Sequence, residues 1–150
     1  MKHVLILGCG NPLRGDDGLG WVVTDCLASV LNDPSVEVIQ TQQLTPELAE
    51  PVSRASLVIV VDASHTGRPG SWKREEIEIS GTEPGKLGHH FSPAALLAYA
   101  SAVFHSTPRM LLVSVAIKSV DCNEGLTPEI EASLPEVVRH VCEQAARELE

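Results

Sequence analysis

The chain has 150 residues, which is enough for one domain with a substantial hydrophobic core. Hydrophobic residues make up 43% of the sequence, a fraction typical of globular proteins that excludes a disordered chain. The net charge of -9 disfavours nucleic acid and anionic membranes as partners, because both bind Lys and Arg.

The first half of the chain alternates strand and helix patterns. Residues 4–7 form a continuous apolar run before Gly8, which predicts a parallel strand buried on both faces. Residues 18–31 place their apolar side chains on one helical face, and residues 36–39 predict a short second strand. Thr45 and Pro46 predict the start of another helix, with Thr45 as its N-cap.

The second half continues this alternation. The aliphatic run 57–61 predicts the strongest strand of the chain, and residues 72–79 predict an edge strand. A helix from Ser92 to about Phe104 and a buried strand over 110–117 follow. Thr127 and Pro128 predict the start of a last helix that runs to the C-terminus. Pro135 should bend or split that helix.

The order of these elements predicts an α/β fold. We expect residues 1–150 to form a single-domain three-layer sandwich, with a mostly parallel twisted sheet of about five strands and helices on both faces. The cysteines form no CxxC pair, which argues against a zinc knuckle or a thioredoxin motif; they are Cys9, Cys26, Cys122 and Cys142. We expect buried, reduced thiols, and the short N-terminal apolar run fits neither a signal peptide nor a spanning helix. Together these observations predict a cytoplasmic protein.

Polar residues gather where ligands bind in open α/β sheets, at the carboxyl ends of the strands. Asp16 and Asp17 follow the first strand, and Asp62 follows the third. His89 and His90 precede the helix that starts at Ser92. Two carboxylates and an imidazole that converge on one crevice predict a site for a divalent transition metal.

Two other interpretations of these residues are open. The GxG at residues 8–10 is similar to part of a dinucleotide motif, but Leu13 replaces the third Gly, and Asp16 and Asp17 would repel a pyrophosphate. The acids could also be structural: Asp16 or Asp17 could cap the following helix, and Asp62 could bond the backbone near Ser64. We expect the other histidines to be structural or solvated, with His65 a minor ligand candidate; they are His3, His65, His105 and His140.

Four segments resemble the hydrogenase maturation protease family. The first is G-C-G-N-P-L-R-G-D-D-G-L-G at residues 8–20, which is similar to the opening motif of that family. It is followed in the family's order by V-V-D-A-S at 60–64, G-H-H-F-S-P at 88–93 and E-G-L-T-P-E-I-E-A-S-L-P-E at 124–136. The resemblance therefore covers nearly the whole chain.

The resemblance implies an endopeptidase that removes the C-terminal extension of a nickel-iron hydrogenase large subunit after nickel insertion. The partner would be the precursor of that subunit, and the protease would be a monomer when free. Asp17, Asp62 and His89 would bind nickel carried by the substrate, with His90 competing for the place of His89 and Asp16 supporting the site. Other divalent metals could substitute for nickel.

The reaction itself has two open routes. The bound metal could polarise a carbonyl or lower the pKa of a bound water, or it could only dock the substrate while Asp16 acts as general base. A nucleophilic Ser or Cys is not indicated, because GxSxG is absent and Cys9 has no obvious His partner in the sequence. The HExxH motif of metalloproteases that hold their own zinc ion is absent too. The alternative function is a non-catalytic nickel-binding accessory protein of hydrogenase assembly.

Overall fold

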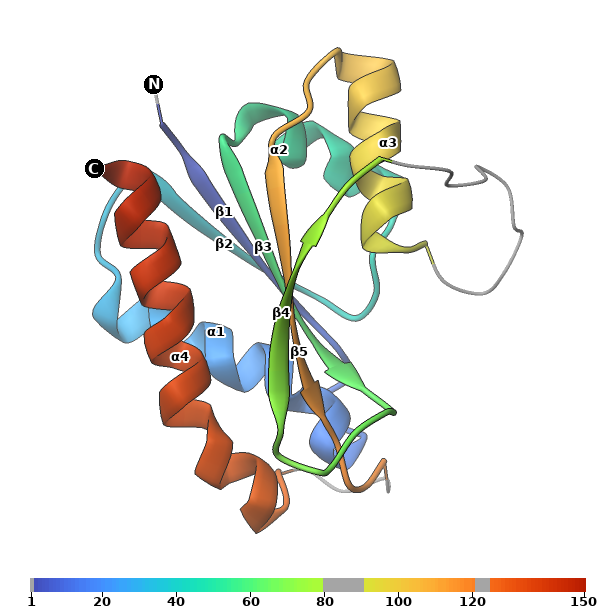
Figure 1. Cartoon of the computed structure of the whole chain (residues 1–150), viewed down its shortest axis with the longest axis vertical. Helices are drawn as coiled ribbons and strands as arrows, with labels where there is room; N and C mark the ends of the chain where they lie inside the picture. The colour runs from blue at the N-terminus through green and yellow to red at the C-terminus, as the bar shows by residue number, and fades with distance from the viewer. Residues whose placement is uncertain (1, 80–90, 121–124) are drawn as a thin grey trace.

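The computed structural model describes residues 2–79, 91–120 and 125–150. In this part of the chain a five-stranded sheet lies between two layers of helices, as Figure 1 shows. The strands are β1 (Val4–Cys9), β2 (Val36–Thr41), β3 (Leu57–Ser64), β4 (Trp72–Ile77) and β5 (Arg109–Ala116). The helices are α1 (Leu19–Val30), α2 (Ala49–Arg54), α3 (Pro93–Phe104) and α4 (Pro128–Leu149), with short 3₁₀ segments η1 (Gly15–Gly18) and η2 (Pro46–Leu48). The predicted α/β sandwich is confirmed.

The sheet is parallel apart from one edge strand. Its order is β2-β1-β3-β5-β4, and only β4 runs antiparallel to its neighbour. The carboxyl ends of β1, β3 and β5 therefore lie at the same edge of the sheet, which is the lower edge in Figure 1. The prediction of an edge strand over residues 72–79 is confirmed by the position of β4.

Two hydrophobic clusters fill the spaces between the layers, because successive strand residues face opposite sides of the sheet. Val4, Ile6 and Val113 belong to the cluster beneath α1 and α4. Leu5, Val60 and Met110 belong to the cluster beneath α2 and α3. Figure 1 shows α2 and α3 beside the upper part of the sheet, away from the carboxyl ends of the parallel strands.

Helix α1 lies unusually close to the end of β1. A Cβ atom on Gly20 would come 2.4 Å from the carbonyl oxygen of Cys9, and one on Gly8 would come 2.5 Å from the carbonyl oxygen of Gly20. Since both nearby atoms belong to the backbone, neither position has room for a larger residue. These two glycines therefore allow the backbone of α1 to pack directly against the backbone at the end of β1.

The structure confirms some local expectations about the helices and corrects others. Pro135 does not split the last helix, because α4 is continuous over 22 residues with Pro135 inside it. Thr45 and Thr127 hold the N-cap positions of η2 and α4, but neither side chain makes a capping hydrogen bond. Ser92 does cap α3, since its Oγ accepts from the backbone N–H of Ala95 at 3.0 Å.

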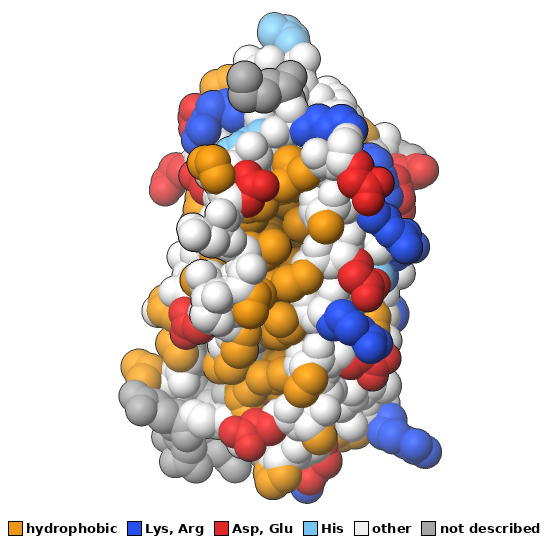
Figure 2. Space-filling model, turned by 90° about the vertical axis from the view of Figure 1, so that its left-hand side faces the viewer, with side chains coloured by type: hydrophobic (Ala, Val, Ile, Leu, Met, Phe, Trp, Pro, Cys, Tyr) orange, Lys and Arg blue, Asp and Glu red, His pale blue; other side chains and the backbone are white. Residues whose placement is uncertain are grey.

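The side of the molecule that carries α4 is incompletely covered. Figure 2 shows a strip of hydrophobic side chains along this side, bordered by charged residues. The hydrophobic residues that are only partly buried over this half of the core include Val22, Leu31, Val36, Val38, Val138, Cys142 and Leu149. The expectation of buried thiols is wrong for Cys26 of α1, which is exposed. Cys9, Cys26 and Cys142 are all unpaired.

None of the helices in the described ranges combines the length and the hydropathy that a bilayer crossing needs.

Candidate functional site

Asp16 is an internal anchor. Its side chain is fully buried, and both carboxylate oxygens accept hydrogen bonds. Oδ2 accepts from the backbone N–H groups of Lys118 and Ser119 at 3.0 Å each. Oδ1 accepts from the backbone N–H of Thr127 at 2.7 Å, and the Thr127 hydroxyl lies within 3.0 Å of both oxygens. Asp16 thus joins the loop after β1 to the segments on either side of the β5–α4 connection.

These contacts set the charge state of Asp16. Burial alone would raise the pKa of its carboxyl group, but the hydrogen bonds from Thr127, Lys118 and Ser119 together outweigh burial and lower the pKa below 3.8. Asp16 does not cap α1, whose N-cap position is held by Gly18. A carboxylate whose oxygens are all engaged is poorly placed to take a proton from water.

Asp17, the next residue, has a different environment. Its Oδ2 accepts from the backbone N–H of Asn11 at 2.9 Å, and the side chain is only partly buried. Gly10 makes this loop possible, because it has a φ of 137° and a Cβ there would lie 1.9 Å from the carbonyl oxygen of Asp17. The loop 10–17 therefore folds back on itself and holds Asp17 beside the end of β1.

Asp62 lies in β3, one position beyond Val61, which pairs with Gly8 of β1. It shares the face of α2 and α3 with Val60 and with Cys9, since side chains alternate along a strand. Its Oδ1 accepts from the backbone N–H of Ala63 at 2.8 Å, so the predicted local bond to the backbone near Ser64 is present. The side chain is partly buried.

Cys9 connects the two acids electrostatically. Burial raises the pKa of its thiol strongly, and the negative charges of Asp62 and Asp17 raise it further. Both carboxylates therefore act on the same buried sulfur at the carboxyl end of β1. The thiol stays protonated at neutral pH, which agrees with the expectation that Cys9 is not a nucleophile.

The third expected ligand cannot be placed: His89 and His90 lie outside the described residues. Within residues 2–79, 91–120 and 125–150, no group of three His, Cys, Asp or Glu side chains could hold a metal. His65, the minor candidate, is exposed. Asp17 and Asp62 are thus the two proposed ligands whose surroundings the structure describes.

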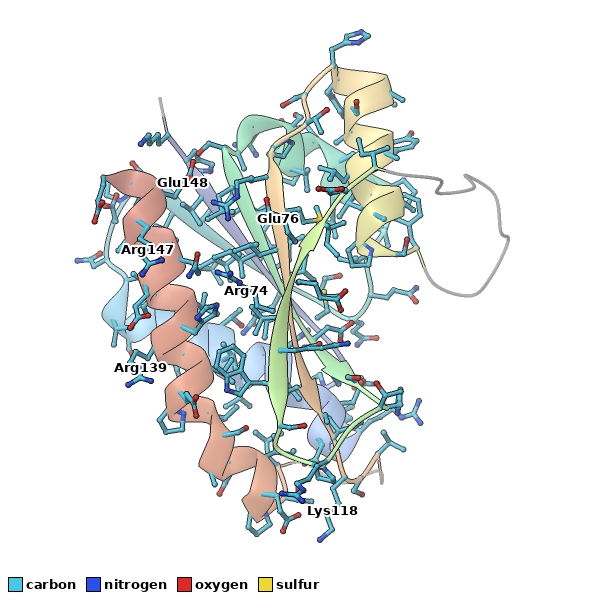
Figure 3. The ribbon with its side chains drawn as sticks, in the orientation of Figure 1. Arg74, Glu76, Lys118, Arg139, Arg147 and Glu148 are labelled. Carbon is cyan, nitrogen blue, oxygen red and sulfur yellow. The ribbon has the colours of Figure 1, made fainter. Side chains whose placement is uncertain are left out.

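His140 has a structural environment on the opposite side of the sheet. Its ring lies 4.9 Å from that of Trp72. Burial lowers the pKa of His140, and the nearby charges of Arg74 and Arg147 lower it further, against a smaller opposing effect of Glu143. Figure 3 shows Arg74 on β4 and Arg147 on α4, on the side of the sheet that α4 covers. His140 is therefore a packed, neutral side chain, as expected.

Sequence reasoning missed two residues beside Asp62. In the sheet register, Asp62 pairs with Ser114 of β5, and Ser114 pairs with Lys73 of β4. The three side chains consequently form a row across one face of the sheet. A single serine inside the apolar run 110–117 gave no signal, because its importance depends on strands that are distant in sequence.

Known structures share this architecture. The hydrogenase maturating endopeptidase HybD from E. coli superposes with a TM-score of 0.81 at 24% identity, over 97% of this chain and 93% of that one. A hydrogenase 2 maturation peptidase from a Thaumarchaeota archaeon gives a TM-score of 0.74 at 27% identity, over 97% and 99% of the two chains. The solution structure of an endopeptidase from Escherichia coli gives 0.76 at 26% identity, over 97% and 93%. No family model matches the sequence, and no curated protein matches it.

The α/β fold, which here carries an acidic loop at the carboxyl ends of the strands, is shared with a known maturation peptidase and a known endopeptidase. The likeness extends over nearly the full length of each chain, as the four motifs along the sequence predict. These neighbours, at 26–27% identity, are a hydrogenase 2 maturation peptidase and an endopeptidase, which supports the resemblance to the hydrogenase maturation protease family.

Proposed function

We propose that this protein removes the C-terminal extension of a nickel-iron hydrogenase large subunit, and that it recognises the nickel already inserted into that subunit. One observation carries the proposal: the loop after β1 holds Asp17 beside the end of that strand, and Asp62 lies at the same edge on the neighbouring strand β3. Two carboxylates at the carboxyl ends of neighbouring strands are suited to a metal ion that arrives with the substrate.

The surroundings of the two acids support a role in binding. Each has one carboxylate oxygen held by a neighbouring backbone N–H, from Asn11 for Asp17 and from Ala63 for Asp62. Such bonds orient a carboxylate, much as a second shell orients metal ligands. An imidazole from His89 or His90 would complete a set of two oxygens and one nitrogen. Three protein ligands leave positions open for substrate groups or water.

The geometry of Asp16 narrows the choice of general base. Its pKa is lowered and its oxygens are occupied, so it would have to break bonds to Lys118, Ser119 or Thr127 before it could accept a proton. We therefore assign Asp16 a positioning role. The group that activates the attacking water is then the metal carried by the substrate, Asp17 or Asp62.

The test compares nickel-loaded and nickel-free large-subunit precursors on a gel. We expect the wild-type protein to shorten only the loaded precursor. Asp17→Asn and Asp62→Asn should each lower the rate by about 10²-fold or more without changing the circular dichroism spectrum. Asp33→Asn, a change at an exposed loop residue, is the matched control and should cleave normally.

Two outcomes would change the proposal. A loaded precursor that binds but is never shortened would favour the accessory-protein function. Equal cleavage of loaded and nickel-free precursors would refute recognition of nickel. His89→Ala and His90→Ala, compared in the same assay, would show which imidazole is required.

A further inference from the structure

A small pocket lies next to Asp62 on the same face of the sheet. Its volume is about 180 Å³, and its lining is rich in hydroxyl groups; the lining residues are Ser64, Thr66, Gly67, Ser71, Trp72, Lys73, Ser114 and Ala116. Ser114 and Ala116 of β5 form its floor, since they pair with Asp62 and Ser64 of β3. The pocket therefore borders Asp62 on the side that faces away from Asp17 and β1, because β3 separates β5 from β1.

Ser114 is the unusual member of this pocket. Only 6% of the residue is exposed and its Oγ is shielded in the rotamer present, yet this Oγ forms no hydrogen bond with any residue that the structure describes. A buried hydroxyl without a partner is destabilising by about 1–3 kcal/mol, so such a group calls for an explanation. A ligand that accepts a hydrogen bond from this hydroxyl would offset that loss of stability.

The other hydroxyls of the pocket already have partners within the β3–β4 turn. Ser64 Oγ lies 3.1 Å from Thr66 Oγ1, and Ser71 Oγ donates to the carbonyl oxygen of Arg68 at 2.6 Å. These local bonds order the turn that contributes part of the pocket lining, and Ser114 is left as the lining hydroxyl without a partner among the described residues.

The chemistry of the lining indicates what would bind. Lys73 provides an ammonium group that is 3.5 Å from Glu75 Oε1 and largely exposed, so it can turn toward a ligand. The Ser114 hydroxyl and the Lys73 ammonium are both hydrogen-bond donors. Since a water molecule takes up about 30 Å³, the pocket has room for one short side chain but not for a larger cofactor.

We propose that this pocket is a specificity subsite, in which Ser114 Oγ, turned toward the pocket by rotation about χ1, donates a hydrogen bond to a carboxylate or carboxamide side chain of the substrate peptide near the scissile bond. The inference rests on the proposed endopeptidase function. The place of Ser114 beside Asp62 in the sheet register would put the bound side chain next to the cleavage site. Ser114 would therefore select the substrate without taking part in bond cleavage.

The first test is Ser114→Ala, assayed on a nickel-loaded precursor that the wild-type protein cleaves. We expect KM to rise about fivefold to tenfold, as for the loss of one hydrogen bond, while kcat stays within about twofold. The melting temperature should stay the same or rise, because the variant loses an unsatisfied buried hydroxyl. Ser29→Ala, at an exposed position of α1, is the control and should change neither constant.

A second test uses the substrate. Polar residues flanking the cleaved bond are changed to Ala one at a time, and each altered precursor is given to the wild-type and the Ser114→Ala protein. At one position of the precursor, the change to Ala should raise KM for the wild-type protein but should not raise KM further for Ser114→Ala. This non-additivity indicates a direct contact between the two side chains. Ala116→Leu, which fills the pocket and keeps its hydroxyls, should raise KM at least as much as Ser114→Ala.

The results distinguish a failure of the proposed endopeptidase function from a failure of the proposed Ser114 subsite. If the wild-type protein cleaves no loaded precursor, the proposed function fails. If wild-type and Ser114→Ala proteins cleave with equal KM, or if Ser114→Ala lowers kcat alone, the subsite is refuted and the function stands. Purely additive effects at every flanking position would also refute the subsite.

Discussion

Removal of the Asp16 carboxylate should destabilise the protein more than it affects the chemistry. Asp16→Ala leaves three backbone N–H groups without an acceptor, those of Lys118, Ser119 and Thr127. The Thr127 hydroxyl loses its acceptor too, but it can rotate toward another partner. At about 1 kcal/mol for each of the three N–H groups, we expect a loss of about 3 kcal/mol in the free energy of unfolding. For a chain of 150 residues this corresponds to a drop of about 6–12 °C in melting temperature.

The same residue predicts a dependence of stability on pH. The folded state holds the Asp16 pKa below its ordinary value of 3.8, so the unfolded state binds more protons once the pH falls below about that value. The contribution of Asp16 is therefore fully present above pH 3.8 and is lost as the pH falls through the folded-state pKa. Asp16→Asn, which cannot ionise, should remove this part of the acid sensitivity.

The assay is urea denaturation of the wild-type, Asp16→Ala, Asp16→Asn and Asp33→Asn proteins at pH 7 and at pH 3. Asp33 is exposed, so Asp33→Asn should lie within about 0.5 kcal/mol of the wild type at pH 7. A variant Asp16→Ala that melts within about 1 °C of the wild type but cannot cleave a precursor would contradict this reasoning. Asp16 would then belong to the catalytic machinery.

Three further predictions concern the loop, the thiol and the last helix. Gly10→Ala should lower cleavage about tenfold or more with the fold retained, measured as the initial rate beside a circular dichroism spectrum, because its Cβ would collide with the carbonyl oxygen of Asp17. Cys9→Ala should still cleave, and iodoacetamide should modify Cys26 but not Cys9 in the folded protein; mass spectrometry that found alkylated Cys9 would contradict its burial. Pro135→Ala should raise the melting temperature by a few degrees, because it restores an N–H inside α4, and a calorimetric scan that showed a drop would refute this.

Much of the fold could be predicted because burial on both faces of a sheet requires unbroken apolar runs. Residues 57–61 show this most clearly: all five are buried in β3. Strand β4 could be predicted as an edge strand because its sequence is mostly charged. A strand with exposed charged side chains cannot lie in the middle of a buried sheet. The continuity of α4 through Pro135 was not predictable, because the packing of the whole helix outweighs a single unfavourable residue.

The sequence predicted that Asp17 and Asp62 lie near the end of β1, but it did not predict the different surroundings of Asp16 and Asp17. Adjacent acids at residues 16 and 17 have the same chemistry, and nothing local in the sequence distinguishes their roles. The groups that bind Asp16 lie more than 100 residues further along the chain, at Lys118, Ser119 and Thr127. Ser114 was overlooked for the same reason: its position beside Asp62 is created by strand pairing.

The different roles of the two acids follow from the short 3₁₀ segment that carries them. A 3₁₀ helix has three residues per turn, so consecutive side chains point about 120° apart. When Asp16 points inward to the β5–α4 connection, Asp17 must point elsewhere, and it lies within electrostatic reach of Cys9 at the end of β1. Asp62 stands on β3, which pairs with both β1 and β5. The anchor at Asp16 therefore fixes Asp17 relative to the same strands that carry Asp62 and Ser114, so hydrogen bonds within the protein hold a loop acid beside a strand acid.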